Sequence, residues 1–165
     1  MDYSFEPLID RTSKILILGT IPGQISIKKC QYYANTKNQF WDIIYTIYNT
    51  PIHGSYENKC AFLLRNNIAL WDVLAHGNRK GSSDNTIKNE SPNDILGLLE
   101  DYPNIETFIF NGSKSEKLFR KYFSEISEKM NCIRVSSSSP TPGKYVKSLE
   151  EKKIELSKAI NKDIH

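Results

Sequence analysis

The sequence lacks the features of a membrane, secreted or metal-binding protein. No apolar run approaches the roughly 18 residues that a membrane-spanning helix needs, and the acidic N-terminus has no basic region before an apolar stretch, so we expect no signal peptide. Cys30, Cys60 and Cys132 are far apart and form no CxxC, which argues against a zinc ribbon, a disulfide framework or an iron–sulfur site. We therefore expect no metal, no other cofactor and a reducing, cytoplasmic location.

A strong excess of one charge is also missing. The 165 residues include 22 Lys and Arg against 19 Asp and Glu, a formal net charge of +3. This balance excludes a histone-like protein that binds by bulk charge, but it is compatible with one local phosphate-binding surface. Hydrophobic residues make up 39% and no repeat or linker divides the chain, so we expect one domain over residues 1–165, in a monomer.

What the sequence does contain is an alternation of apolar runs and helical patterns. Continuous β-prone runs predict four buried strands, at residues 14–18, 67–74, 107–110 and 132–135. Helical spacing or capping signals predict helices at residues 40–48, 92–102, 113–123 and from residue 148. Strands that are apolar throughout and alternate with helices indicate an α/β fold, with a mostly parallel sheet covered on both faces.

Local signals place the starts of three of these helices. Ser91-Pro92 predicts a start with Pro in the first turn and Asp94 near the positive end of the helix dipole. Ser113 and Glu116 have the spacing of a capping box, and so do Ser148 and Glu151.

The segments that follow the predicted strands share an unusual composition. Ligands of such sheets bind beyond the carboxyl ends of the strands. The four segments there are rich in Gly, Ser, Asn or Pro, at residues 19–23, 72–83, 111–112 and 136–145. We therefore expect one shared site at this edge of the sheet.

Two segments suit recognition of a planar base. The backbone amides of residues 19–23 can approach an anion or a base edge, although this segment alone also fits a simple strand-ending turn; it is neither a P-loop nor a GxGxxG motif. Residues 31–41 combine aromatic, amide and cationic side chains, which suits stacking on a ring while amides read its edge. The alternative makes Asn35 or Asn38 a helix N-cap and the aromatic residues part of the core.

Polar residues after the later strands have similar alternatives. Asp72 ends an apolar strand and must find a donor, either in a structural network or in a bound substrate. The loop with Arg79, Lys80, Ser82 and Ser83 either contacts phosphates or is simply solvated. The four serines before Pro140 offer hydroxyls and amides to phosphates. No Ser–His–Asp arrangement is present, and we expect His76, near the predicted site, to be a bystander.

Read in order, these segments resemble the uracil-DNA glycosylase superfamily, and most closely its hypoxanthine-DNA (deoxyinosine) glycosylase branch. The resemblance runs over roughly residues 14–158. It is carried by residues 16–23, Ser26, residues 31–41, 68–74, 79–84, 92–94, 110–112 and 137–140. It implies a three-layer α/β/α fold with a four-stranded, mostly parallel sheet, and removal of a deaminated base from DNA by base flipping.

The resemblance also implies roles for individual residues. Asn38 matches the catalytic amide of an Asn-x-Phe-Trp segment that holds the attacking water, whereas Ile21 stands where better-known relatives carry a catalytic Asp or Asn. Tyr33 matches the aromatic residue that stacks on the flipped base, and Asp72 the residue that reads it. Residues 137–140 match the loop that presses into the duplex, without its usual His-Pro-Ser form.

The resulting prediction is a monofunctional glycosylase that hydrolyses deoxyinosine and leaves an abasic site, because no nucleophilic Lys lies in the motifs. A uracil or xanthine glycosylase of the same fold, or a non-catalytic binder of damaged nucleic acid, are the alternatives. Besides Asn38, the predicted base contacts are Gly19, Thr20, Ile21, Pro22, Gly23, Tyr33, Asp72 and Asn111. The predicted DNA contacts are Ser26, Lys37, Arg79, Lys80, Ser82, Ser137, Ser138, Ser139 and Pro140. With Lys144, the basic residues of this set predict a local cationic rim.

Overall fold

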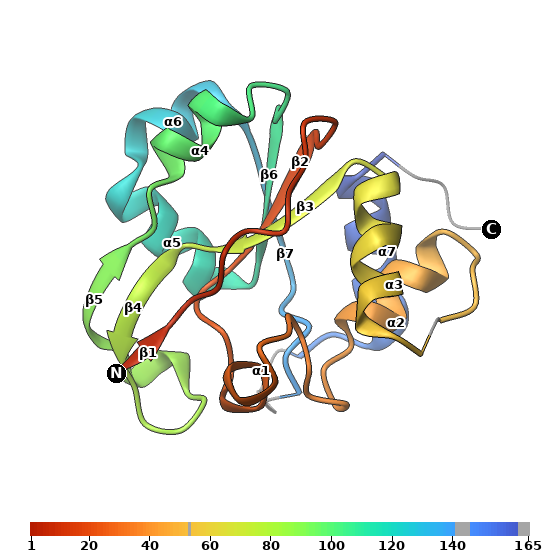
Figure 1. The fold of residues 1–165 in the computed structure, drawn as a ribbon, viewed down its shortest axis with the longest axis horizontal. Helices are drawn as coiled ribbons and strands as arrows, with labels where there is room; N and C mark the ends of the chain where they lie inside the picture. Colours follow the sequence, from red (N-terminus) through yellow and green to blue (C-terminus); the bar gives the residue numbers. More distant parts are fainter. Residues whose placement is uncertain (53, 141–145, 162–165) are drawn as a thin grey trace.

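The four apolar runs form one parallel sheet. A computed structural model describes the protein except for residues 53, 141–145 and 162–165. In sheet order the strands are β3 (Ile68–Asp72), β2 (Ile15–Gly19), β6 (Thr107–Asn111) and β7 (Asn131–Val135), all parallel to their neighbours. The predicted four-stranded parallel sheet is therefore confirmed (Figure 1).

Helices cover both faces of this sheet, because side chains of a strand alternate between its two faces. On β2, Ile17 packs into one apolar cluster with residues of α2 (Phe40–Ile47), α3 (Tyr56–Arg65) and α7 (Leu149–Ala159). Its neighbours Leu16 and Leu18 pack into a second cluster with α4 (Ile95–Asp101), α5 (Ser113–Tyr122) and α6 (Ser124–Lys129). The three-layer α/β/α arrangement is confirmed, with the two helix groups on opposite sides of the sheet in Figure 1.

The prediction of one strand over residues 67–74 was wrong, because the chain changes sheet at Val73. β3 ends at Asp72, and β4 (Leu74–Asn78) pairs instead with β1 (Asp2–Tyr3) and β5 (Lys88–Pro92) in a small antiparallel sheet. Asn93 stabilises this break: its side-chain amide donates to the carbonyls of Asp72 and Leu74, at 2.8 and 3.1 Å, and its backbone N–H donates to that of Val73 at 2.8 Å.

The segments beside this small sheet are short. Helix α1 (Gln24–Lys29) follows the loop after β2, and the 3₁₀ helix η1 (Asp84–Thr86) lies between β4 and β5.

None of the helices in the described part of the chain is long and apolar enough to cross a membrane. All three cysteines are within the described residues and are free thiols.

Two of the predicted helix starts need correction. Ser91 and Pro92 belong to β5, and α4 begins after Asp94, whose carboxylate accepts the N–H of Gly97 at 2.9 Å. Ser113 is not a cap but the first helical residue of α5, and the N-cap is Gly112. Gly112 has φ of 106°, and a Cβ there would lie 3.2 Å from Ser137 Cβ, so this tight passage favours glycine.

The third predicted start is confirmed. The Ser148 hydroxyl accepts the N–H of Glu151, and the Glu151 carboxylate accepts the N–H of Ser148. This capping box begins α7.

A core substitution tests the packing under α5. Phe119 is fully buried, with its ring centroid 5.1 Å from that of Phe108, 5.0 Å from Phe110 and 5.3 Å from Phe123. We expect Phe119→Ala to lower the free energy of unfolding by about 3–5 kcal/mol in urea denaturation, since it leaves a cavity. Leu96→Ala, at a position 57% exposed, is the control and should change it little. Equal losses from the two variants would contradict this packing.

Candidate active site

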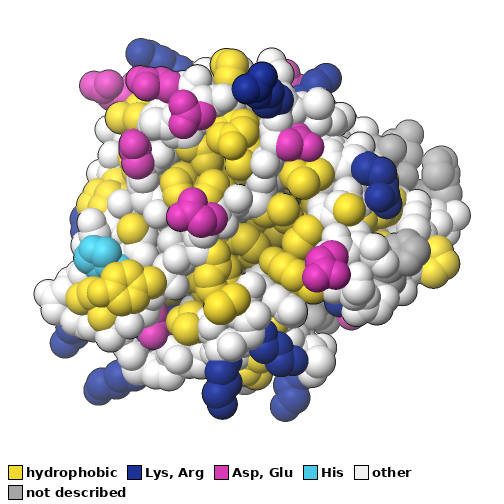
Figure 2. Space-filling view, viewed as in Figure 1, with side chains coloured by type: hydrophobic (Ala, Val, Ile, Leu, Met, Phe, Trp, Pro, Cys, Tyr) yellow, Lys and Arg dark blue, Asp and Glu magenta, His cyan; other side chains and the backbone are white. Residues whose placement is uncertain are grey.

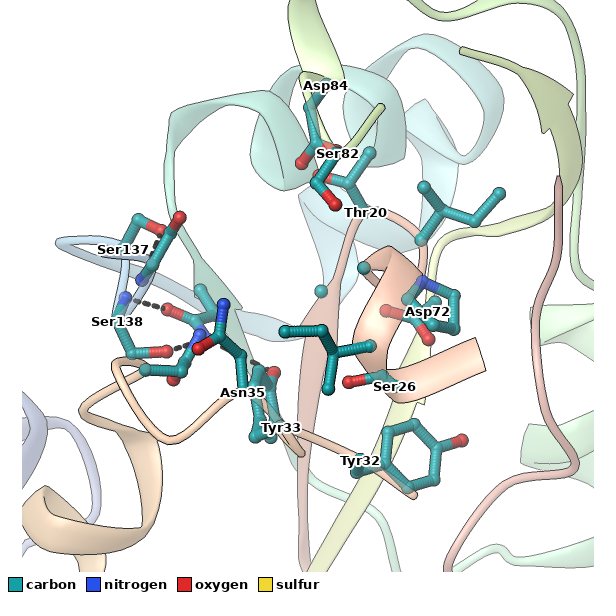
Figure 3. A pocket seen from close by; sticks show the side chains of 18 of the residues that line it. Thr20, Ser26, Tyr32, Tyr33, Asn35, Asp72, Ser82, Asp84, Ser137 and Ser138 are labelled. Atoms are coloured by element: carbon teal, nitrogen blue, oxygen red, sulfur yellow. Dashed lines mark hydrogen bonds between the residues drawn. The ribbon is translucent and has the colours of Figure 1, made fainter. Parts of the chain in front are cut away.

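A cavity of about 290 Å³ opens at the carboxyl ends of the parallel strands, where the sequence predicted a site. All four segments that follow the strands contribute to its lining, through residues 19–23, Asp72 with Arg79, Asn111, and residues 137–140. Further lining residues come from the start of α1 and from the loop before α2. They include Asn38, and also Tyr33 and Asn35, which Figure 3 shows. The predicted convergence on one site is confirmed.

The close approach of Asp72 and Tyr33 to the end of β2 depends on Gly19. A Cβ on Gly19 would lie 2.6 Å from Asp72 Oδ1 and 3.5 Å from the Tyr33 hydroxyl, so a larger residue would displace one of them. The backbone carbonyls of Gly19 and Thr20 accept the N–H groups of Val73 and Leu74, at 2.9 and 3.1 Å. The loop after β2 is thereby held against the start of β4. The side chain of Ile21 itself packs into the core, on the side of α4 and α5.

Asn111, at the end of β6, joins three parts of the site. Its side-chain amide donates to the Tyr33 hydroxyl at 3.1 Å and to Ser138 Oγ at 2.9 Å, and its Oδ1 accepts the Ser138 N–H at 2.9 Å. The Tyr33 ring stacks on Phe40, with centroids 4.0 Å apart. Because Phe40 covers one face of the ring and Tyr33 lines the cavity, the other face is available to a planar base.

Asn38 lines the cavity and also helps to begin α2. Its Oδ1 accepts the N–H of Phe40, the first helical residue, at 2.9 Å. The N-cap itself is Gln39, so the alternative role as a helix-starting residue holds in part for Asn38. Asn35 instead turns the preceding loop, where its Oδ1 accepts the N–H of Lys37 at 3.0 Å. The described residues show no other hydrogen bond of the Asn38 side chain, so with respect to them one lone pair of its oxygen and its NH₂ group are open to a ligand.

Asp72 carries a buried carboxyl group that its surroundings compensate only in part. The residue is 5% exposed, and its Oδ2 is buried with no hydrogen-bond partner among the described residues. Burial, the largest cause, and the nearby charge of Asp84 together raise the pKa of Asp72 to about 7, against the opposing charge of Arg79. The alternative was a protein network that satisfies this carboxylate. The described residues provide no such partner for Oδ2, so this oxygen is left for a ligand.

Arg79 needs reassignment from phosphate binding to loop stabilisation. Its side chain is only 1% exposed, and it pairs with Asp2 and Asp84, both at 3.0 Å. It also donates to the backbone carbonyl of Pro22. The guanidinium thus ties β1, the loop after β2 and η1 together, and its donors are directed to these groups instead of to Asp72.

The predicted DNA-contacting residues are distributed unevenly around the cavity. Ser82, Ser137, Ser139 and Pro140 lie along its lining, and Ser138 is buried there. Ser26 lines it from α1, although its hydroxyl already accepts the N–H of Ala34 at 3.1 Å.

Among the described basic residues of the prediction, the buried Arg79 lines the cavity, whereas the two lysines lie outside its lining. Lys37 and Lys80 are exposed residues of neighbouring loops, and Lys144 falls outside the described residues. Lys28 and Lys29, which the sequence reasoning had missed, are exposed at the end of α1. Lys and Arg side chains also lie along the edge of the molecule that carries α1 in Figure 2. Of the predicted cationic rim, Lys37 and Lys80 are therefore exposed near the cavity and Arg79 is buried, and the rim stays a prediction.

Comparisons with known proteins agree with this geometry. No family model matches the sequence. A hypoxanthine DNA glycosylase of Methanosarcina barkeri (strain Fusaro) is 42% identical over 112 residues, which are 67% of this chain and 71% of that protein. The hypoxanthine DNA glycosylase of Methanosarcina acetivorans is 41% identical with the same coverage. This chain belongs to the hypoxanthine DNA glycosylase family.

A solved structure extends the similarity to nearly the whole chain of this family member. A solution NMR structure of a Methanosarcina acetivorans protein, provisionally assigned as a uracil DNA glycosylase, superposes with a TM-score of 0.79 and 31% identity. The match covers 97% of this chain and 98% of the other. The predicted family and the uracil-DNA glycosylase-like fold are therefore confirmed.

Sequence reasoning missed two acidic residues of this glycosylase site. Asp84 lines the cavity and pairs with Arg79, and Asp2 pairs with Arg79 from β1. Asp84 stood at the end of the 79–84 segment that carries the resemblance, so a signal for it was present. Asp2 and Arg79 are 77 positions apart, and no local pattern links them. Among the described residues, no cluster of His, Cys, Asp or Glu is arranged to hold a metal ion.

The buried carboxyl group of Asp72 should reduce stability at high pH. The pKa of Asp72 is about 7 in the folded protein, against 3.8 for an ordinary Asp. Between about pH 4 and 7 the folded state therefore keeps a proton that the unfolded state releases, so the free energy of unfolding falls as pH rises through this range and then levels off. We expect Asp72→Asn to raise the free energy of unfolding at pH 8 by about 1–3 kcal/mol, with the gain vanishing near pH 4. Urea denaturation across this range measures it.

The control for this prediction is Glu106→Gln, at an exposed position between α4 and β6, for which we expect no gain in the free energy of unfolding that changes with pH. A gain from Asp72→Asn that stays constant with pH would contradict the assignment of a buried, ionising carboxyl group.

Proposed function

We propose that this protein hydrolyses the N-glycosidic bond of deoxyinosine in DNA, releasing hypoxanthine and leaving an abasic site. The observation that carries the proposal is the buried Oδ2 of Asp72, which has no hydrogen-bond partner among the described residues and belongs to a cavity also lined by Tyr33 and Asn38. A buried acceptor without a donor is costly for the free protein, so its place is explained by a ligand that supplies the donor.

Entry of the base follows from the shape of the cavity. A base inside a duplex cannot reach it, so the nucleotide must flip out of the stack, at a cost of a few kcal/mol that is lower for a weakly paired base. Inosine pairs imperfectly, which favours its extrusion. The free face of Tyr33 then stacks on the base, and Asp72 accepts the N1–H of hypoxanthine. Adenine lacks a hydrogen at N1 in its normal tautomer.

Bond cleavage separates charge between the sugar and the base. Positive charge develops on the sugar, and negative charge develops on the base as the electron pair of the C1′–N9 bond leaves with it. The Asn38 side chain holds a water at C1′, which adds there and loses a proton, while the departing base takes one up. Backbone amides of residues 19–23, which line the cavity, can stabilise the developing negative charge.

Uracil is the second candidate base. Its N3–H beside a carbonyl presents the same donor and acceptor pair to Asp72 as the N1–H edge of hypoxanthine. The similarity to a Methanosarcina protein provisionally assigned as a uracil DNA glycosylase, over 97% of this chain, favours including it. Xanthine shares the same edge. A monomeric state and a cytoplasmic location stay predictions.

The role of Asn38 is tested by base release. Duplexes with a single inosine, uracil or xanthine are incubated with the enzyme, and abasic sites are cleaved with alkali. We expect release fastest from the inosine duplex, and we expect Asn38→Ala to lower its rate at least about a hundredfold. The variant also loses the contact to the Phe40 N–H, which costs about 1 kcal/mol.

Asn66→Ala is a control of matched stability, because the Asn66 amide donates to the Phe62 carbonyl at the end of α3, away from the cavity. It should release base at the wild-type rate. Faster release from the uracil duplex would favour the second candidate. A wild-type protein that binds these duplexes but releases no base would be a binder, and the proposed activity would be wrong.

The rate of base release should depend on the ionisation of Asp72. With a pKa of about 7, this carboxyl group is mostly neutral at pH 6 and mostly ionised at pH 8. An ionised carboxylate accepts a stronger hydrogen bond from N1–H, so kcat/KM on the inosine duplex should rise up to about tenfold over this range. Asp72→Asn should give a flat profile. The same rise in this variant would show that another group titrates.

A further inference from the structure

Helix α7 carries a lysine buried behind the site. Lys152 is 5% exposed, and its Nζ donates to Gln39 Oε1 at 2.8 Å. Burial lowers the pKa of Lys152, which the charge of Glu155 partly offsets. No carboxylate among the described residues forms a salt bridge with it. A buried ammonium whose partner is a neutral amide is costly, so the stability of the fold does not explain its presence.

Gln39, which accepts the hydrogen bond from Lys152, is the chain neighbour of two residues of the site. Gln39 lies between Asn38, which lines the cavity, and Phe40, on which Tyr33 stacks. The backbone N–H of Gln39 donates to the Ser138 carbonyl at 3.0 Å. Gln39 therefore connects the loop that carries Asn38 to the serine loop, and Lys152 holds the side chain of this connecting residue.

The same helix holds the serine loop at a second point. Glu155, three positions after Lys152, accepts the backbone N–H of Ser136 at 2.7 Å and its hydroxyl at 3.2 Å. The two contacts from α7 thus reach the two loops that place Asn38 and Ser138 beside the cavity. Ser138 is in turn bonded to Asn111, so the contacts continue to Tyr33.

The surroundings leave Lys152 few other polar partners. A small cavity beside Lys152 is lined mainly by apolar residues, Ile17, Phe40, Ile43, Val135 and Leu156, and Asn111, Ser136 and Ser138 are its other polar residues. Among the described residues, the hydrogen-bond partner of Lys152 is Gln39. Gln39 is also the N-cap of α2, the positive end of the helix dipole, where a cation is unfavourable. An apolar side chain at position 152 would suit both surroundings better than an ammonium does.

We propose that Lys152 is a positioning residue for base release, and that its ammonium group, by holding Gln39, sets the place of the Asn38 side chain relative to the serine loop. This inference rests on the proposed function. Its distinguishing consequence is that stability and catalysis respond in opposite directions when the ammonium is removed, whereas a residue that only supported the fold would lower both.

Lys152→Met is the direct test, because it keeps the length of the side chain and removes its charge. We expect an unchanged or higher melting temperature, a kcat on the inosine duplex about tenfold to a hundredfold lower, and little change in KM, since misplacement by about 1 Å can cost this much. Amide hydrogen exchange at Gln39 should become faster. Lys152→Arg should recover part of kcat, and Lys158→Met, exposed on the same helix, should match the wild type.

A second variant separates the hydrogen bond from other effects. Gln39→Leu removes the acceptor, and the double variant with Lys152→Met should be no slower than the slower single variant, because both act through one contact. Additive losses, or a Lys152→Met enzyme with the wild-type kcat, would overturn the inference. If Lys152→Met does not fold, the opposite response of stability is wrong and the inference fails.

The proposed function has a separate mode of failure. If the wild-type protein releases no base from any duplex, the proposed activity is wrong. Amide exchange at Gln39 in Lys152→Met then still reports whether the lysine holds this loop. Unchanged exchange would overturn the positioning role.

Discussion

The shape of the site depends on the hydrogen bonds of one side chain, that of Asn111. Its amide and carbonyl groups contact Tyr33 and Ser138, which come from two separate loops. Ser138 then accepts the Gln39 N–H, and Gln39 is held by Lys152. These contacts run from the end of a central strand to the C-terminal helix. They give the loops around the cavity a fixed arrangement before any base enters, so less ordering is required on binding.

The charges on the other side of the cavity are arranged around the guanidinium group of Arg79. Arg79 pairs with Asp2 and Asp84 and donates to the Pro22 carbonyl. The charges of Arg79 and Asp84 both shift the pKa of Asp72, yet its buried Oδ2 has no hydrogen-bond partner among the described residues. The arrangement stabilises the loops around the cavity and leaves one polar group for the substrate. Such local instability is typical of a functional site.

Local patterns predicted the sheet and most of the helices because these depend on the side chains of the segment itself. The apolar runs at β2 and β6 are buried on both faces, so their composition alone indicates a parallel strand between helices, whereas β7, at the edge of the sheet, is only partly buried and leaves Arg134 exposed. The break at Val73 could not be predicted in the same way, because it depends on Asn93, some 20 positions downstream. Similarly, Ser113 with Glu116 has the capping-box pattern, but the backbone conformation of Gly112 sets the helix start.

The sequence by itself determined the four parallel strands in their chain order, the presence of α2, α4, α5 and α7, and the edge of the sheet where ligands bind. It also determined the family, through the combined motifs around Asn38, Asp72 and the serine loop. Only the tertiary structure decided the state of the charged groups. Arg79 forms an ion pair with Asp2, 77 positions away in the chain, and Lys152 forms a hydrogen bond with Gln39, 113 positions away. The physical reason is that burial and pairing depend on distances in space, whereas periodicity and turn signals depend on neighbours along the chain.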